Sequence, residues 1–309
     1  MVARLRAAGC VFAEEEAALL REAVPPGPAR QALVDRRVAG APLEQVLGWV
    51  AFAGLRVPVR PGVFVPRRRT ELLAEQAVAA CPPGGVVVEL CCGAAAVSLV
   101  VLAAHPGAEL HAADLDPVAV ECARANLAGR ASVHTGDLYA ALPSRLAGRA
   151  DVLVANAPYV PTASIALMPA EAREHEPTTA LDGGGDGLAV LSRVVAGAPT
   201  WLAPGGWLLV ECSERQTGPL GDLAVASGLR PEIRRDVDRE AVALLATPVG
   251  RRGLTAVATT AGSGTSPSEP VGSSAPLVRR PGGALSRRSA PRRAGARGHR
   301  GRPAAGRSA

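Results

Sequence analysis

The residues best suited to chemistry are Asn156-Ala157-Pro158-Tyr159, which follow the apolar run DVLVA. The side-chain carbonyl of Asn156 and the backbone carbonyl of Ala157 can each accept a hydrogen bond from one planar NH2 group. Pro158 stiffens the turn, and the Tyr159 ring can cover the flat group beside a cationic donor. Because an amide nitrogen is weakly nucleophilic, this fixed geometry suits an in-line methyl transfer. Taken alone, the four residues also fit an ordinary strand-ending turn.

A second group of residues, upstream, fits a nucleoside-containing cofactor. The run VVVELCCGAAAVSLV is followed about 25 residues later by HAADLDP. In a doubly wound sheet, the first strand-to-helix turn cradles the cofactor, and an acid after the second strand holds the ribose hydroxyls. Asp114 is that acid, and Asp137, after the third strand, can meet an adenine edge. The candidate cofactor-binding residues are Glu89, Cys91, Gly93, Asp114, Leu115, Asp137, Leu138 and Asn156.

The turn CCGAAA distinguishes two cofactor classes that use this frame. A dinucleotide requires G-x-G-x-x-G, because its pyrophosphate must approach the backbone and the helix N-terminus closely. This turn has a single glycine, Gly93. S-adenosylmethionine (SAM) has no phosphate and tolerates a looser turn. We therefore expect SAM as the cofactor, and neither a metal nor a catalytic histidine is required.

An alternation of strands and helices must position these residues. Continuous apolar strands that alternate with helices indicate a mostly parallel sheet covered on both faces. The ligand crevice then lies between the first and fourth strands, at their carboxyl ends, so Asn156 would lie beside the cofactor. We expect strands at 86–90, 109–114, 131–134, 151–155 and 207–211, helices at 96–104, 117–127, 187–202 and 215–226, and a terminal antiparallel pair at 229–234 and 241–246.

The 309 residues leave room for smaller parts beside this sheet. Two helices, at 13–23 and 29–39, and short β-like runs precede it. We expect an α/β protein: a Rossmann-like class I SAM-dependent methyltransferase sheet with a small N-terminal helical subdomain and a disordered C-terminal tail. The expected division is 1–48 for the helical subdomain, 49–68 for a β-hairpin linker, 69–248 for the methyltransferase domain and 249–309 for the tail.

The tail carries the positive charge of the chain. Residues 249–309 contain 12 arginines and one acid, Glu269, so their formal charge is +11, and that of the rest is −5. A composition so rich in Gly, Ser, Pro and Arg cannot bury enough apolar surface to fold. We expect a disordered extension; the alternative is an arm that binds nucleic acid or the ribosome through its arginines.

Targeting and redox features favour the cytoplasm. Acidic residues come too early in the chain for a signal peptide. The apolar stretch 86–104 is long enough to suggest a membrane span, but Glu89 and a Cys-Gly-Ala turn interrupt it, so a strand, a turn and a helix are expected. The six cysteines form no C-x-x-C pair and fit reduced core residues better than a zinc site. We expect a cytoplasmic monomer.

Three further stretches, VPRRRTELL, HEPTTALDGGGDGL and LAPGGWLLVE, complete a recognisable pattern with Asn156-Ala157-Pro158-Tyr159. Over most of its first 248 residues the chain resembles the HemK/PrmC-type protein N(5)-glutamine methyltransferases. Their hallmark N-P-P-Y is shared with DNA N(6)-adenine methyltransferases, whereas the other stretches favour a protein-glutamine enzyme. The matching positions there are Pro66, Arg67, Thr70, Glu71, Glu176, Pro177, Ala180, Leu181, Gly183, Gly184, Asp186, Gly187 and Leu188.

The resemblance implies a substrate and a set of roles. The methyl acceptor would be the glutamine at the Gly-Gly-Gln tip of a class I peptide-chain release factor, with SAM as donor. The implied partner is thus a release factor. We expect no membrane partner, and nucleic acid would bind only through the basic tail. Asn156-Ala157-Pro158-Tyr159 would be the catalytic residues. The implied substrate-binding residues are Arg67, Thr70, Glu71, Glu176 and Pro177.

The chain departs from the family pattern in the SAM turn, the hallmark and the tail. Cys91 and Ala95 replace glycines of the usual E/D-x-G-x-G-x-G turn, which would crowd the methionine moiety of SAM. Ala157 replaces the first proline of the hallmark, and Arg68 replaces a proline of the linker pattern. Two alternatives therefore stay open: a methyltransferase that acts on another planar NH2, of a nucleic-acid base or a different protein, and a degenerate fold that serves as a binding module.

Overall fold

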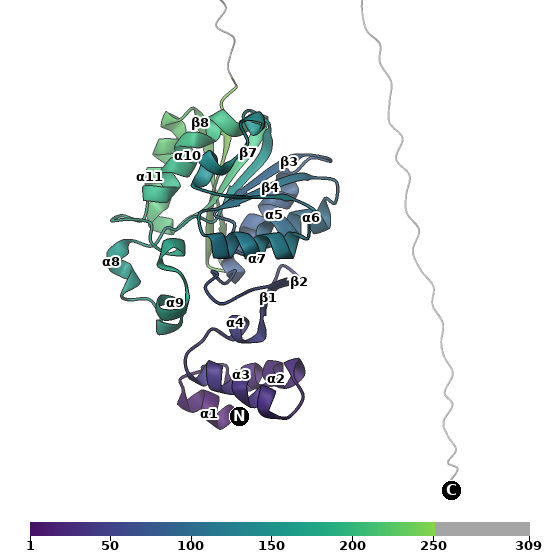
Figure 1. The fold of residues 1–309 in the computed structure, drawn as a ribbon. Helices are drawn as coiled ribbons and strands as arrows, with labels where there is room; N and C mark the ends of the chain where they lie inside the picture. Colours follow the sequence, from purple (N-terminus) through teal and green to yellow (C-terminus); the bar gives the residue numbers. More distant parts are fainter. Residues whose placement is uncertain (251–309) are drawn as a thin grey trace, which may run out of the picture. The chain divides into compact units, whose positions relative to one another are not determined.

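The computed structural model describes residues 1–250, whose core is a seven-stranded sheet (Figure 1). The strand order is β5-β4-β3-β6-β7-β9-β8. Strands β3 to β7 are parallel, β9 runs antiparallel to β7, and β8 runs antiparallel to β9. The predicted sheet is confirmed. The strands are β3 (Val86–Leu90), β4 (Glu109–Asp114), β5 (Ser132–Thr135), β6 (Ala150–Ala155), β7 (Leu202–Glu211), β8 (Leu229–Asp236) and β9 (Ala241–Pro248).

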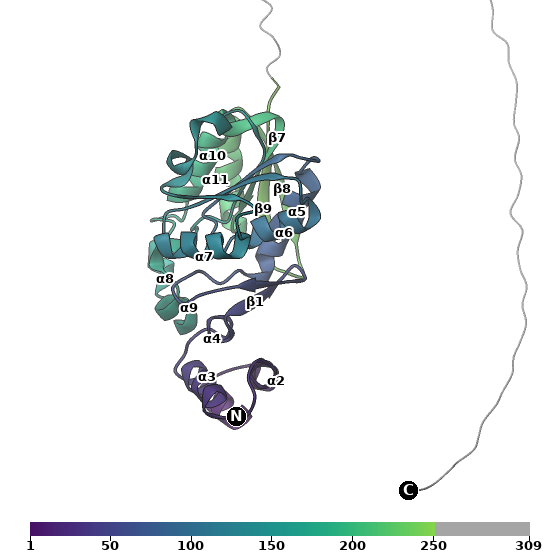
Figure 2. The same ribbon diagram turned by 45° about the vertical axis from the view of Figure 1, so that its right-hand side comes forward.

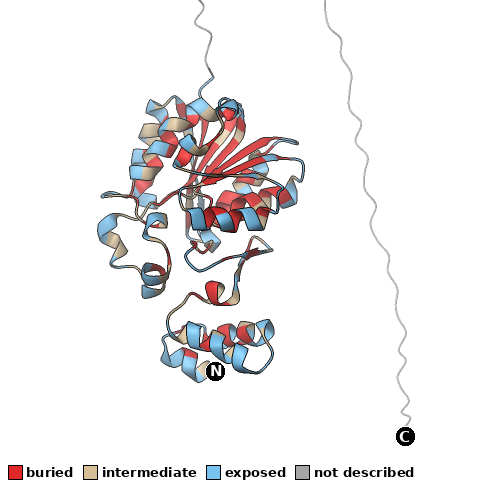
Figure 3. Cartoon of the chain, viewed as in Figure 1, coloured by how far each residue is buried: buried red, intermediate tan, exposed pale blue. Residues whose placement is uncertain are grey.

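Helices cover both faces of the sheet, and strand β3 shows why (Figures 1 and 2). All five of its residues are buried, and successive side chains point to opposite faces. Val87 joins the core beneath α5, α6 and α7, whereas Val86 and Val88 join the core beneath α10 and α11. Figure 3 shows buried residues along the strands and on the inner sides of these helices. The helices are α5 (Glu71–Ala80), α6 (Ala96–Ala104), α7 (Pro117–Leu127), α10 (Ala189–Trp201) and α11 (Thr217–Ala226).

A small helical group with its own core precedes the sheet. Leu5, Leu20, Val34 and Val46 are the buried aliphatic side chains around which it packs. This core is separate from the two cores of the sheet. The helices are α1 (Val2–Ala7), α2 (Ala13–Ala23), α3 (Pro28–Val38) and α4 (Leu43–Leu47).

A β-hairpin, expected within residues 49–68, links this group to the sheet. Its strands are β1 (Trp49–Phe52) and β2 (Leu55–Pro58), paired antiparallel. The two residues between them both have positive φ, as a two-residue hairpin turn requires. Phe52 and Val57 point into the core beneath α5 and α6, so the hairpin packs on the helical layer of the sheet.

The segment between β6 and α10 contains two short helices that the sequence does not predict, α8 (Thr162–Ile165) and α9 (Ala170–His175). Contacts with the N-terminal group hold α9 in place. Arg37 of α3 lies 3.1 Å from Glu171, and Gln45 of α4 donates a hydrogen bond to the backbone oxygen of His175 at 3.5 Å. Single-turn 3-10 helices complete the list: η1 (Arg68–Thr70), η2 (Leu138–Ala141), η3 (Ser144–Leu146), η4 (Thr178–Ala180) and η5 (Glu214–Gln216).

The largest departure from the expected elements is in β7, which begins at Leu202 rather than at 207. Leu202 pairs with Ala150, and the register then shifts so that Trp207 pairs with Val152. Residues 203–206, which include a proline and two glycines, lie at this bulge-like shift in register, where such residues are tolerated in a strand. The other predicted ends either coincide with the observed ones or differ by one or two residues, which is the usual scatter at fraying termini.

Stretch 86–104 divides into β3, a turn and α6, and within residues 1–250 no helix is both long and apolar enough to cross a membrane. All six cysteines are free thiols; five are buried, and Cys91 is partly exposed. The boundaries at 48 and 68 stay predictions. The predicted disordered tail lies outside the described residues, except for Val249 and Gly250.

Candidate active site

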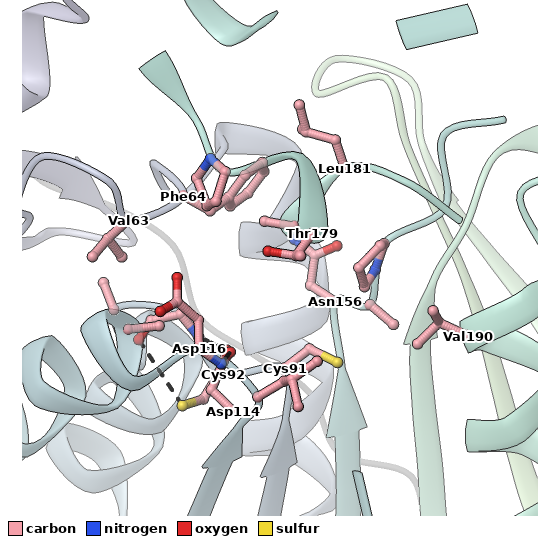
Figure 4. A pocket seen from close by; sticks show the side chains of 18 of the residues that line it. Val63, Phe64, Cys91, Cys92, Asp114, Asp116, Asn156, Thr179, Leu181 and Val190 are labelled. Carbon is pink, nitrogen blue, oxygen red and sulfur yellow. Dashed lines mark hydrogen bonds between the residues drawn. The ribbon is translucent and has the colours of Figure 1, made fainter. Parts of the chain in front are cut away.

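A cavity lies where β3, β4 and β6 end (Figure 4). Asp114, Cys91 and Asn156 surround its inner side, and Phe64 and Thr179 lie across from them. Strand order reverses between β3 and β6, so their two following turns leave the sheet in opposite directions and open a crevice. The predicted cofactor-binding residues and the four hallmark residues all line this one cavity.

The carboxylate of Asp114 holds the first turn in shape. Its Oδ2 accepts a hydrogen bond from the backbone N–H of Gly93 at 2.8 Å, and its Oδ1 accepts one from the N–H of Asp116 at 2.9 Å. Burial raises the pKa of Asp114, and these N–H groups oppose the rise because they stabilise the ionised form. Each oxygen keeps a second lone pair, so the predicted contact with ribose hydroxyls is sterically and chemically open.

Glu89 anchors the start of helix α6. Its carboxylate accepts hydrogen bonds from the backbone N–H of Ser98, at 2.9 Å, and from the Ser98 hydroxyl. An acid at this place satisfies a free N–H of the first helical turn and interacts favourably with the helix dipole. Burial nevertheless raises the pKa of Glu89 to about 7. The glutamate of the E-x-C-x-G turn therefore shapes the cofactor side of the cavity from within the core.

The turn after β3 requires a left-handed backbone at three alternate positions. Cys91, Gly93 and Ala95 have φ of 53°, 53° and 58°. These are the three glycine positions of the E/D-x-G-x-G-x-G pattern, so the left-handed backbone explains why the pattern has glycine there. A residue with a Cβ adopts this conformation at a cost of about 1–2 kcal/mol. The fold thus keeps the turn despite Cys91 and Ala95, and the Cys91 side chain is added to the cavity wall.

Asp137, predicted to meet an adenine edge, forms an ion pair with Arg193 of α10 at 2.7 Å. Both side chains are about half exposed, so the pair contributes little to stability. Both residues also line the cavity. The adenine contact stays a prediction, and a ligand there would meet the Asp137–Arg193 pair rather than a lone carboxylate.

The amide of Asn156 is held in one orientation. Its Nδ2 donates a hydrogen bond to Oγ1 of Thr70 at 3.2 Å. The Oδ1 atom is therefore the free acceptor of this side chain. Thr70 ends the 3-10 turn that follows the hairpin linker, so a residue of the linker pattern orients the first residue of the hallmark. Both residues line the cavity.

The Tyr159 ring forms part of the same wall, and its polar end points away from it. Its hydroxyl donates to Oε1 of Glu211 at 3.1 Å, and the guanidinium of Arg69 lies 5.9 Å from the ring centre. Burial and the neighbouring Glu211 raise the pKa of the phenol. Tyr159 is thus a neutral flat surface at physiological pH.

A buried amide, Gln216, fixes the backbone beside Tyr159. Its Nε2 donates to the backbone oxygens of Tyr159 and Gly187, both at 3.0 Å. Its Oε1 accepts from the backbone N–H and the hydroxyl of Ser213, both at 2.9 Å. All four hydrogen-bonding positions of the amide are used. Gln216 therefore ties three loops, including the one that carries the hallmark.

The glycines of the ALDGGGDGL stretch allow two backbones to touch. A Cβ at Gly183 would lie 2.8 Å from the Cα of Tyr159, and one at Gly187 would collide with the Tyr159 carbonyl. Gly187 also has a φ of +78°, which disfavours other residues. The stretch therefore serves as a brace for the hallmark turn.

The structure divides the predicted substrate-binding residues into two groups. Arg67, Thr70 and Pro177 line the cavity, but Glu71 and Glu176 do not. Glu176 is buried and receives Arg67, at 2.6 Å, and the N–H of Val65. This arrangement joins the linker to the loop before α10 and makes Glu176 a support for Arg67.

Glu71 faces the hairpin instead of the cavity. Its carboxylate accepts the N–H of Ala53 at 2.9 Å and lies 3.4 Å from Arg239. Adjacent residues of a helical turn do not share a face, so Thr70 can point to the cavity while Glu71 points elsewhere. The structure places Glu71 against the hairpin turn and outside the cavity, and its contact with a substrate stays a prediction.

Several residues of the site were not predicted from the sequence. Gln216 could have been noticed, because Ser213-Glu214-Arg215-Gln216 has the spacing of a capping box. Glu211 could be found as the acid that ends the fifth parallel strand, at the carboxyl edge. The structure adds to the site residues that include Val63, Phe64, Arg69, Asp116, Arg193, Glu211 and Gln216.

Known proteins are similar to this chain. Residues 54–197 match the family model described as "Methyltransferase small domain". The chain is 36% identical to a release factor glutamine methyltransferase of Moorella thermoacetica over 202 residues, which cover 63% of this chain and 70% of that protein. The chain belongs to the release factor glutamine methyltransferase family.

Two further comparisons bear on the extent of the likeness. A release factor glutamine methyltransferase of Geobacter sulfurreducens is 36% identical over 182 residues, which cover 58% of this chain and 63% of that protein. The match thus spans less than two thirds of the Geobacter relative. A crystal structure of a methyltransferase from Pyrococcus furiosus is 16% identical, with a TM-score of 0.48, and the match covers 70% of this chain and 96% of that one.

Members of this family use SAM as cofactor, and the cavity suits it. Three carboxylates, of Glu89, Asp114 and Asp137, line the cofactor side. Arg193 compensates the charge of Asp137, and burial raises the pKa of Glu89 to about 7. Asp114, whose ionised form is stabilised by backbone N–H groups, is therefore the carboxylate that would favour a cationic sulfonium and amino group over a pyrophosphate. The fold is that of class I SAM-dependent methyltransferases, as predicted.

Replacement of Cys91 by glycine should tighten SAM binding. The change relieves a left-handed non-glycine backbone and removes the thiol from the cavity wall. We expect Cys91→Gly to lower the dissociation constant of SAM several-fold in isothermal titration calorimetry. Ala128→Gly is the matched control, because exposed Ala128 has a φ of 47° at the end of α7, outside the cavity. It should raise the free energy of unfolding by about 1 kcal/mol and leave SAM binding unchanged. Equal SAM affinity in Cys91→Gly and the original chain would contradict crowding by the thiol.

Replacement of Gly187 by alanine should disrupt the brace of the hallmark turn. The new Cβ would collide with the Tyr159 carbonyl and lie 2.7 Å from Nε2 of Gln216. We expect the free energy of unfolding to fall by at least about 2 kcal/mol in urea denaturation. Gly185→Ala is the control, because a Cβ there meets no atom within 4 Å. Similar stability of the two variants would show that the close contact is not tight.

Proposed function

We propose that the chain transfers the methyl group of SAM to the side-chain amide nitrogen of a glutamine, and that this glutamine lies in a peptide-chain release factor. The orientation of Asn156 carries the proposal. Because Nδ2 of Asn156 is hydrogen-bonded to Thr70, its carbonyl oxygen is left to accept a hydrogen bond from the methyl-accepting group of the substrate. An NH2 group can donate that hydrogen bond. The family and the names of the relatives support a glutamine of a release factor.

The acceptor amide would be held by two carbonyl groups. Oδ1 of Asn156 and the backbone oxygen of Ala157 would each accept one N–H of the glutamine side chain. As the nitrogen forms its bond to the methyl group, positive charge develops on it and both hydrogen bonds strengthen. SAM supplies an electrophilic methyl group when it is bound. The transfer converts NH2 to NH-CH3 and releases one proton.

The walls of the cavity would restrict the acceptor to a productive orientation. The Tyr159 ring covers one face of the flat amide, and Pro158 limits the motion of the turn. Phe64 and Leu181 contribute apolar surface and limit the access of water. Arg67, Thr70 and Pro177 line the cavity on the linker side, where we place the neighbouring backbone of the substrate.

The roles of the remaining segments are part of the same proposal. We propose that residues 69–248 form the catalytic domain, and that 1–48 and the hairpin linker 49–68 dock the substrate. The Arg37–Glu171 and Arg67–Glu176 ion pairs support these roles, because they connect residues 1–68 to the segment between β6 and α10. Release factors act in the cytoplasm, where the six free thiols would remain reduced. We propose a cytoplasmic monomer.

The decisive experiment is a methylation assay with labelled SAM. A release factor with an intact Gly-Gly-Gln tip should accept label, and its Gln→Ala variant should not. Asn156→Ala should lower kcat by about 100- to 1000-fold, because a hydrogen bond to the developing charge is lost. SAM affinity, measured by calorimetry, should stay within about twofold.

Three outcomes would contradict parts of this proposal. Label on the Gln→Ala release factor would indicate a different acceptor, such as another protein side chain. Failure to bind SAM at millimolar concentration would favour a binding module over an enzyme. Near-normal turnover of Asn156→Ala would exclude the role given to Asn156.

Restoration of the family proline at position 157 should be tolerated. No hydrogen bond is donated by the N–H of Ala157 within residues 1–250, so its loss leaves no acceptor unsatisfied. We expect Ala157→Pro to raise the free energy of unfolding by about 0.4–1 kcal/mol, because proline restricts the unfolded chain. Initial rates on the release factor should be equal or higher. A drop in both quantities would show that the N–H of Ala157 has a role of its own.

A further inference from the structure

Glu211, the last residue of β7, is a buried carboxylate that the chemistry above does not use. Only 3% of the residue is exposed. Its Oε1 lies 3.1 Å from the Tyr159 hydroxyl and 3.3 Å from Nε of Arg69. Burial of a carboxylate costs free energy unless partners compensate for the lost water. An aliphatic residue would fill this place at a lower cost, so packing alone does not account for Glu211.

Glu211 lies behind the acceptor side of the cavity. Arg69, Thr70 and Tyr159 line the cavity, but Glu211 itself does not. These three residues come from two segments that are distant in the sequence. Tyr159 and Arg69 contact the carboxylate directly, and the Thr70 side chain is near enough to lower its pKa. Glu211 therefore connects the linker segment and the hallmark turn from the side opposite to the substrate.

The directions of the hydrogen bonds link Glu211 to Asn156. Because Asn156 donates to Oγ1 of Thr70, the hydroxyl proton of Thr70 must point to another acceptor. Oε2 of Glu211 is buried, and within residues 1–250 it has no hydrogen-bond partner, so it is the acceptor that the Thr70 hydroxyl can turn toward. An ionised carboxylate only accepts, so it draws the Thr70 proton toward itself. This leaves the lone pairs of Thr70 Oγ1 for the NH2 group of Asn156.

The surroundings of Glu211 favour its ionised form against the effect of burial. Burial raises the pKa of the carboxyl, and Thr70, the charge of Arg69 and the Tyr159 hydroxyl each lower it. Arg69 is 44% exposed, so it keeps its charge in contact with water. The Tyr159 hydroxyl donates to Glu211, which is the direction that an ionised acceptor imposes, and the same charge would draw the Thr70 hydroxyl proton toward Oε2.

We propose that Glu211 is a positioning residue for the methyl transfer, and that it acts through Thr70 and Tyr159 to make Asn156 present its carbonyl oxygen to the acceptor. The inference rests on the proposed glutamine methylation, since an NH2 acceptor requires facing carbonyl oxygens. A reversed Asn156 amide would place its own NH2 against the NH2 of the substrate. A charge that two residues, Thr70 and Asn156, separate from the substrate thereby sets which end of Asn156 faces the cavity.

Glu211→Gln tests this role, because it keeps the shape of the side chain and removes the charge. Glutamine can donate to Thr70, which frees the Thr70 hydroxyl to turn toward Asn156. We expect kcat on the release factor to fall 10- to 100-fold, while the calorimetric affinity for SAM is unchanged. The free energy of unfolding should stay equal or rise, because a buried charge is removed. Glu214→Gln, an exposed carboxylate paired with Arg235, is the control and should change none of these.

A second set of variants shows whether Glu211 acts through Thr70. Thr70→Val alone should also lower kcat, and the Glu211→Gln/Thr70→Val double variant should be little worse than the slower single variant. Near-normal kcat in Glu211→Gln, or losses that multiply fully in the double variant, would overturn the proposal. A loss of stability and SAM affinity together with kcat would indicate a merely structural residue and would also overturn it.

One readout is independent of turnover and separates this proposal from the proposed function. In 15N-labelled protein, the side-chain NH2 signals of Asn156, assigned with Asn156→Ala, should shift or broaden in Glu211→Gln and not in Glu214→Gln. An unchanged Asn156 signal would overturn the positioning role even if the enzyme is active. A shifted signal in a chain that does not methylate a release factor would uphold the link to Asn156 and refute the substrate.

Discussion

The reversal of strand order between β3 and β6 is the constraint on which the site depends. These two strands are parallel neighbours, with Leu90 opposite Ala155, so Cys91 and Asn156 leave the sheet side by side. Strands β4 and β5 lie beyond β3 and bring Asp114 and Asp137 to the cofactor side. Strand β7 lies beyond β6 and places Glu211 behind the acceptor side. Strand order alone therefore separates a donor half from an acceptor half.

A parallel sheet brings turns together but does not make them rigid, and the rest of the site supplies that rigidity. The hallmark turn is held from one side by Gln216 and the glycine stretch, which contact the backbone at Tyr159. From the other side it is held through side chains, by Thr70 and Glu211. Methyl transfer depends on orientation, so these supports matter as much as the groups that touch the substrate.

The sheet and its large helices could be predicted from the sequence, because burial on both faces produces continuous apolar runs such as Val86–Leu90. The positions of Asp114 and Asn156 at the carboxyl edge of the sheet could be predicted from the order of the strands. Helices α8 and α9 could not be predicted, because helices of one or two turns depend on tertiary contacts such as Arg37–Glu171. A linear pattern also does not distinguish Thr70, which lines the cavity, from Glu71, which contacts the hairpin.

The departures from the family pattern differ in what they can change. At Cys91 and Ala95 the backbone adopts the left-handed conformation that glycine would prefer, so the fold absorbs the substitutions at a cost of about 1–2 kcal/mol each. Ala95 is buried outside the cavity, and its methyl group therefore affects stability alone. Cys91 adds a thiol to the cofactor wall, and only there does a substitution reach the ligand. At Ala157 the backbone carbonyl, which is the group proposed to hold the substrate amide, is present whichever residue supplies it. The chemistry of the site therefore resides in groups that these substitutions leave in place.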